Sequence, residues 1–175
     1  MTNLLYMYFR PLALLLVLFF SSLSEIQAQD LKGVHMTAPH PRLLMTKADE
    51  ASIKASVKGN GFWRQVDSLL IKAANSALSL PAPQRIVTGR RLLDVSRETL
   101  RRVLLLGYAY RMTGDSRYAQ RAEQELLSVS AFSDWNPSHY LDVAEMTTAV
   151  AVGYDWLFDI MSNDTKETIR KAIIN

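Results

Sequence analysis

Residues 135–159 read WNPSHYLDVAEMTTAVAVGYDWLFD, an apolar stretch of helical length with polar and aromatic side chains at both ends. A helix needed only for packing would not have to carry Asn, Ser, His, Asp and Glu near its entry. The middle of the stretch has the composition of a buried helix. We therefore predict a buried helix whose first turn borders a ligand cleft.

Further helices are predicted on both sides, where apolar residues recur at helical spacing. The first predicted helix starts with a capping box at Thr46. The others cover 62–78, about 95–112, 116 to about 129 and 135–159, and a last one starts at Asp164. No run alternates apolar and polar residues as a half-buried strand does. The sequence predicts an all-α protein of antiparallel helices joined by short turns. A helical repeat array and a closed or partly closed ring of hairpins both fit these elements.

The N-terminus has the features of a secretory signal peptide, residues 1–28. Arg10 precedes an apolar run, Leu12–Leu23, that is too short to span a bilayer, and Ala28 suits a cleavage site. An uncleaved anchor is disfavoured by the short run. The chain has no Cys, which excludes disulfides and a lipidated cysteine. We expect a periplasmic or secreted protein with an extended leader at 29–45 and a helical domain at 46–175.

The formal net charge is +3, and it stays +3 when residues 1–28 are removed, because they contain Arg10 and Glu25. So mild an excess permits an anionic partner without requiring one. No basic cluster with interleaved aromatic residues supports nucleic-acid binding. The sequence also lacks a glycine-rich phosphate loop, a serine nucleophile motif and a metal-binding motif. We expect no nucleic-acid partner, no membrane partner after cleavage of the signal, and no evident cofactor.

Several polar residues at the start of the 135–159 stretch have a structural explanation. Asn136 as the N-cap with Pro137 at the first helical position would begin a helix well, with Ser138 as the alternative cap. His139 is not a preferred capping residue. It is followed at intervals of three by Asp142 and Glu145, so the three can share one rim, but a single His argues against zinc.

Aromatic residues beside this rim favour a carbohydrate-binding surface. Trp135 and Tyr140 flank it, and flat rings of this kind stack on sugar faces. The candidate residues for the cleft are Asn136, Ser138, His139, Tyr140 and Glu145.

The far end of the stretch has a simpler interpretation. Trp156, Leu157 and Ile160 continue its apolar face and are predicted to be buried. Gly153 is predicted to permit close helix packing. Tyr154 and Asp155 can form a structural hydrogen-bonded pair, and His35 and His40 in the leader are predicted to lie at the surface.

Several of these segments together resemble the heparinase II/III-like polysaccharide lyases, with the heparinase II branch as the nearest likeness. They are His40–Leu44, Phe62-Trp63, Arg111–Tyr118, Trp135–Glu145 and Gly153–Leu157. The resemblance covers nearly all of the chain after the signal, and the 135–145 segment is its most specific part.

The resemblance implies an (α/α) toroid of paired helices, followed in complete members by β-sandwich domains. Such enzymes cleave uronic-acid-containing polysaccharides, including heparin and heparan sulfate, by β-elimination. A Tyr, or a Tyr with a His, transfers the proton at C5, while Asn, His or Glu neutralise the uronate carboxylate. Those groups are expected beyond Asn175. We therefore expect an incomplete toroid, truncated before its remaining helices and the β-sandwich domains, with an acidic polysaccharide as partner and no catalytic residue of its own.

Two other functions stay open from the residues alone. One is a non-catalytic helical carbohydrate-binding or scaffold module, and the other is a toroidal glycoside hydrolase that uses carboxylates. The particular glycan, a structural metal in later parts of the protein and the oligomeric state are not determined by the sequence.

Overall fold

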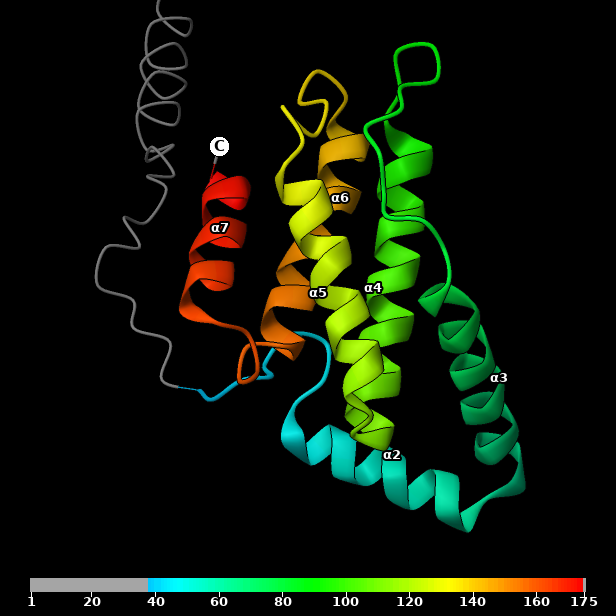
Figure 1. Cartoon of the computed structure of the whole chain (residues 1–175). Coiled ribbons are helices and arrows are strands. Elements are labelled where there is room, and N and C mark those ends of the chain that lie inside the picture. Colours follow the sequence, from blue (N-terminus) through cyan, green and yellow to red (C-terminus); the bar gives the residue numbers. More distant parts are fainter. Residues whose placement is uncertain (1–37, 175) are drawn as a thin grey trace, which may run out of the picture. The chain divides into compact units, whose positions relative to one another are not determined.

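The computed structural model describes residues 38–174, and in this range the chain forms six α-helices and no β-strand (Figure 1). The helices are α2 (Lys47–Gly59), α3 (Gly61–Leu78), α4 (Leu93–Thr113), α5 (Ser116–Ser130), α6 (Tyr140–Trp156) and α7 (Asn163–Ile174). An isolated bridge joins Thr88 to Arg91. The all-α prediction is confirmed for the described residues. The predicted signal peptide and the first part of the leader lie outside them.

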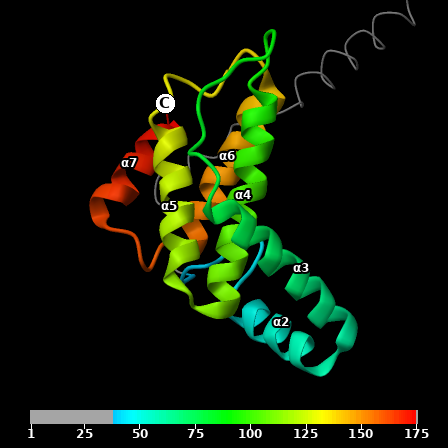
Figure 2. The ribbon, with the colours of Figure 1, turned by 45° about the vertical axis from the view of Figure 1, so that its right-hand side comes forward.

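The helices from α3 to α7 alternate in direction, so that α4 and α6 run parallel to each other while α3, α5 and α7 run the opposite way (Figure 1). Helix α4 packs against α6, α5 and α3, and α5 also packs against α7 and α3. Helices α4 and α6 lie between α5 and α7 on one side and the α2–α3 pair on the other (Figure 2).

Glycine lets α6 approach its neighbours closely. A Cβ on Gly153 would lie 2.7 Å from Val103 Cγ1 and 2.8 Å from Leu126 Cδ2. On α4, a Cβ on Gly107 would lie 2.8 Å from the ring of Trp156. These contacts bring the last turn of α6 close to the middle of α4, and the predicted packing role of Gly153 is confirmed.

Local sequence signals set most helix ends. Thr46 and Asp49 form the predicted capping box at the start of α2. Asn60 caps α3 by accepting a hydrogen bond from Phe62 N. Gly114 ends α4 in the left-handed conformation, with φ of 74°, and Asp115 caps α5. Each of these signals needs only a few neighbouring residues, which explains why the sequence predicts them.

The start of α6 differs from the prediction. The helix begins at Tyr140, with His139 in the N-cap position and no side-chain cap, whereas Asn136 was predicted to be the cap. Asn136 has φ of 60°, in the left-handed region that Asn tolerates, and His139 N donates to Asn136 O at 2.9 Å, which closes a turn over residues 136–139. The Asn136 amide donates to the carbonyl of Arg90, 46 residues away, and to Asp142 on the first turn of α6, so the side chain is held away from the N-cap position.

Burial at the end of α6 agrees with the prediction for Trp156 and Leu157 but not for Ile160, which is 45% exposed. The helix ends at Trp156, so the residues that follow leave its apolar face. Met161 occupies the core in place of Ile160. None of the helices within residues 38–174 is both long and apolar enough to cross a membrane.

Candidate functional site

Asp142 is the centre of the polar cluster where the starts of α4 and α6 meet. Its buried carboxylate accepts hydrogen bonds from Arg91 Nε at 2.8 Å and Nη2 at 2.6 Å. It also accepts from Leu92 N at 2.6 Å and Asn136 Nδ2 at 2.8 Å. These donors, Arg91 first, lower the pKa of Asp142 to about 2. Asp142 therefore links the loop before α4 to the start of α6 through hydrogen bonds.

Asn136 extends this cluster toward Ser138 and His139. Its amide donates to Arg90 O and to Asp142 Oδ2, each at 2.8 Å. Its Oδ1 accepts from Ser138 Oγ at 3.2 Å, and Ser138 Oγ lies 3.0 Å from His139 Nδ1. The three predicted residues at positions 136, 138 and 139 thus lie in one hydrogen-bonded turn, and Asn136 has a positioning role within it.

The remaining candidates lie on the first turns of α6. Tyr140 is 85% exposed, and Glu145 pairs with Arg97 of α4, whose Nε lies 3.0 Å from Oε1. Asp142 points inward and is fully buried, so the predicted common rim of His139, Asp142 and Glu145 is wrong for its middle member. The structure brings the five candidates to one end of α6, where Tyr140 offers an accessible ring.

Sequence reasoning missed the arginines at this end of the molecule. Arg90, Arg91 and Arg97 come from the loop before α4 and from its first turns, about 50 residues before their partners. The density of Arg between positions 85 and 102 is visible in the sequence. Their proximity to α6 follows from the parallel packing of α4 and α6, which no local pattern shows.

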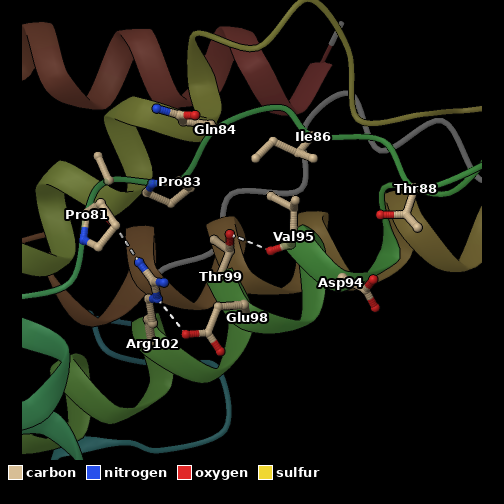
Figure 3. A pocket seen from close by; sticks show the side chains of 11 residues that line it. Pro81, Pro83, Gln84, Ile86, Thr88, Asp94, Val95, Glu98, Thr99 and Arg102 are labelled. Carbon is tan, nitrogen blue, oxygen red and sulfur yellow. Dashed lines mark hydrogen bonds and ion pairs between the residues drawn. The ribbon is translucent and has the colours of Figure 1, made fainter.

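A separate cavity of about 390 Å³ lies between the loop after α3 and the first half of α4 (Figure 3). In Figure 3, Arg102 lies between Pro81 and Glu98, donating to the Pro81 carbonyl at 2.8 Å and to Glu98 Oε1 at 2.7 Å. Hydrogen bonds from Arg101 and then Arg102 lower the pKa of Glu98 to about 2. None of the five candidate residues lines this cavity.

His40 is not the surface residue that was predicted. Its side chain is 13% exposed, its Nδ1 lies 2.5 Å from Asp155 Oδ1, and its ring stacks on Phe158. The second oxygen of Asp155 accepts from the backbone N–H groups of Arg42 and Leu43, at 2.7 Å and 2.8 Å. Asp155, predicted to pair with Tyr154, instead fastens the leader to the end of α6.

Metal binding has no support in the described part of the chain, where no group of three or more His, Cys, Asp or Glu side chains could hold an ion. A comparison with protein-family models finds no match, and a comparison with curated proteins finds no match either.

Acidification should test the role of Asp142. Its pKa in the folded state is about 2, below the ordinary value of 3.8, so the ionised form stabilises the fold above about pH 4. This stability is lost as the pH falls from about 4 to about 2. We expect thermal unfolding of Asp142→Asn to depend less on pH over this interval than that of the unsubstituted protein. Asp164→Asn on α7 is the control and should keep the original pH dependence; an unchanged slope in Asp142→Asn would contradict the assignment.

Proposed function

We propose that residues 46–175 form part of the (α/α) toroid of an exported polysaccharide lyase of the heparinase II/III-like kind. The arrangement of the helices supports this proposal. From α3 to α7, consecutive helices alternate in direction, and α4 and α6 pack side by side as parallel helices. Repetition of such hairpins around an axis generates a toroid, and the chain has the resemblance to these lyases described above.

The observation that carries the proposed substrate class is the combination of charge and aromatic surface at the α4–α6 end. Arg90 is exposed at this end, Arg91 and Arg97 lie beside it in ion pairs with Asp142 and Glu145, and Tyr140 is exposed beside the turn that holds His139. A guanidinium matches carboxylate and sulfate groups geometrically, and an exposed ring can stack on a sugar. Uronic-acid-containing glycans, such as heparin and heparan sulfate, have both features.

The chemical step that we propose for the whole enzyme is β-elimination. The base removes the proton at C5, the C4–O bond breaks, and the electron pair of the C–H bond forms the C4–C5 double bond. The proton returns to the departing oxygen, while donors around the uronate carboxylate stabilise the developing charge. We place the base and the carboxylate-neutralising groups outside this chain, and assign Asn136, Ser138, His139, Tyr140 and Glu145 to supporting or lining the cleft.

This proposal predicts glycan binding without cleavage. The chain should bind heparin but should not generate the ultraviolet absorbance of unsaturated uronate products from heparin, heparan sulfate or alginate. Arg90→Gln combined with Tyr140→Ala should weaken heparin binding about tenfold (~1.4 kcal/mol), because it removes an exposed cation and an exposed ring. Calorimetric titration measures the binding, and ultraviolet absorbance measures the cleavage.

Arg117→Gln is the matched control, since it removes one exposed cation from the start of α5, where Asp115 engages it. It should leave heparin affinity nearly unchanged. Product formation by this chain would refute the placement of the catalytic groups. Absence of binding to each of the three glycans would refute the substrate class.

A further inference from the structure

The tip of the α2–α3 hairpin displays two adjacent aromatic side chains. Phe62 is 63% exposed and Trp63 is 48% exposed, with ring centroids 5.2 Å apart in an edge-to-face arrangement. Trp135 and Trp156, the other tryptophans of the chain, are each 7% exposed. Two large rings exposed side by side are unusual in a surface that has no partner.

The local sequence explains why these rings stay accessible. Gly59 and Gly61 flank the turn and carry no side chains, and Asn60 caps α3 there. Helix α2 has no buried residue, and α3 buries only Ala74 and Ala77, near its far end. The tip consequently extends beyond the well-packed part of the helices, at the opposite end from the loop that precedes α6 (Figure 1).

The same tip carries positive charge. In the described part of the chain, neither Lys58 nor Arg64 has a carboxylate within ion-pair distance, and Arg64 Nη2 donates to the carbonyl of Lys58 at 3.0 Å. The acidic side chains of the hairpin, Asp49, Glu50 and Asp67, are each engaged by neighbouring residues. The charge at the tip is therefore available to an anionic partner.

We propose that this tip, defined as Lys58, Phe62, Trp63 and Arg64, binds a segment of anionic polysaccharide away from the α4–α6 end. The proposal rests on the proposed function for the identity of the polymer. The rings offer faces for sugar stacking, and the two cations pair with carboxylate or sulfate groups. Trp63 also forms one wall of a cleft of about 260 Å³ between α2 and α3, which leaves space beside the indole.

An anionic membrane surface is the competing partner, because aromatic and basic residues also occur in interfacial helices. Such helices need an apolar face along several turns. On α3, the exposed positions after the first turn include Gln65, Ser68 and Lys72, which are polar, together with Leu69. Only the first turn could insert, so the observations favour a polysaccharide.

Tryptophan fluorescence gives a direct test, because iodide in solution should quench Trp63 far more than Trp135 or Trp156. Heparin oligosaccharide should protect Trp63 from iodide, and uncharged dextran should not. Lys58→Gln combined with Arg64→Gln should raise the heparin concentration needed for protection about tenfold, ~1.4 kcal/mol. The matched control, Arg170→Gln with Lys171→Gln on α7, removes the same charge and should have little effect.

The outcomes separate this inference from the proposed function. Heparin binding without protection of Trp63, or an equal loss in the α7 control, would overturn the inference alone. Protection by phosphatidylglycerol vesicles but not by heparin would assign the tip to a membrane and also overturn it. Absence of binding to heparin, heparan sulfate and alginate would refute the proposed function itself. Circular dichroism and thermal unfolding of each variant should match those of the unsubstituted protein, because the substituted side chains are exposed.

Discussion

Replacement of Glu125 by Ala is expected to lower the free energy of unfolding by about 3–5 kcal/mol, the cost of breaking a buried ion pair from one side. Glu125 is fully buried on α5, and its Oε1 contacts Arg121 Nη2 and lies 3.4 Å from Arg102 Nη1. Burial raises the pKa of Glu125, while the two arginines oppose that change. Removal of the carboxylate leaves Arg121 buried with its charge uncompensated.

The stability lost in Glu125→Ala should come from weaker contacts of the connection after α3 as well as from the broken ion pair. Arg121 also donates to the carbonyls of Ala77 and Leu80, at 3.3 Å and 3.0 Å, where α3 ends. A guanidinium that moves toward solvent would give up these bonds. We therefore expect the Glu125→Ala variant to lose protection from hydrogen exchange near residues 77–81 as well as global stability.

Urea unfolding of Glu125→Ala and Glu123→Ala provides the comparison. Glu123 is partly exposed on the same helix and accepts a hydrogen bond from Thr165, so its removal should cost no more than about 1 kcal/mol. Replacement of both Arg121 and Glu125 by Leu should recover part of the stability, because no unpaired charge is left in the core. A loss below about 1 kcal/mol in Glu125→Ala would contradict the role assigned to the pair.

The second large effect is expected at Gly153. Gly153→Ala should lower the free energy of unfolding by about 1–2 kcal/mol, although alanine favours a helix more than glycine does. The added methyl would lie 2.7 Å from Val103 Cγ1 and 2.8 Å from Leu126 Cδ2. Both side chains are buried, so room for the methyl requires Val103 and Leu126 to repack or α6 to move away from α4 and α5.

Gly61→Ala is the matched control for Gly153→Ala. It makes the same change at the start of α3, where nothing lies within 4 Å of the added methyl. Its stability should be unchanged or slightly higher, because alanine restricts the unfolded chain. Equal unfolding midpoints for the two variants would show that close packing at Gly153 does not limit stability.

Much of the secondary structure could be predicted because its causes are local. The Thr46 capping box, the Gly114 turn and the apolar spacing of α3 to α5 each involve residues within a few positions of one another. The start of α6 could not be predicted in this way. Asn136 has the chemistry of an N-cap, but Arg90 and Asp142 hold its side chain elsewhere.

In the candidate site, too, the residue types could be predicted from the sequence, whereas their distant partners could not. The sequence selected five residues that the structure places at one end of α6, but it did not select Arg91 or Arg97, which pair with Asp142 and Glu145. His40 was assigned to the surface because its partner, Asp155, lies 115 residues away. These pairs depend on packing between distant segments, which hydrophobic periodicity does not encode.

The sequence by itself determined that the described chain is helical, where most of its turns lie, and which segment carries the polar and aromatic side chains. Helix periodicity and capping act over a few residues, so these features can be derived without a structure. Only the tertiary structure decided that α4 and α6 run side by side, that Asp142 and Glu125 are buried with arginine partners, and that Trp63 is exposed. Burial and long-range pairing depend on which helix faces meet, and the free energy of a charge or a ring depends on that environment.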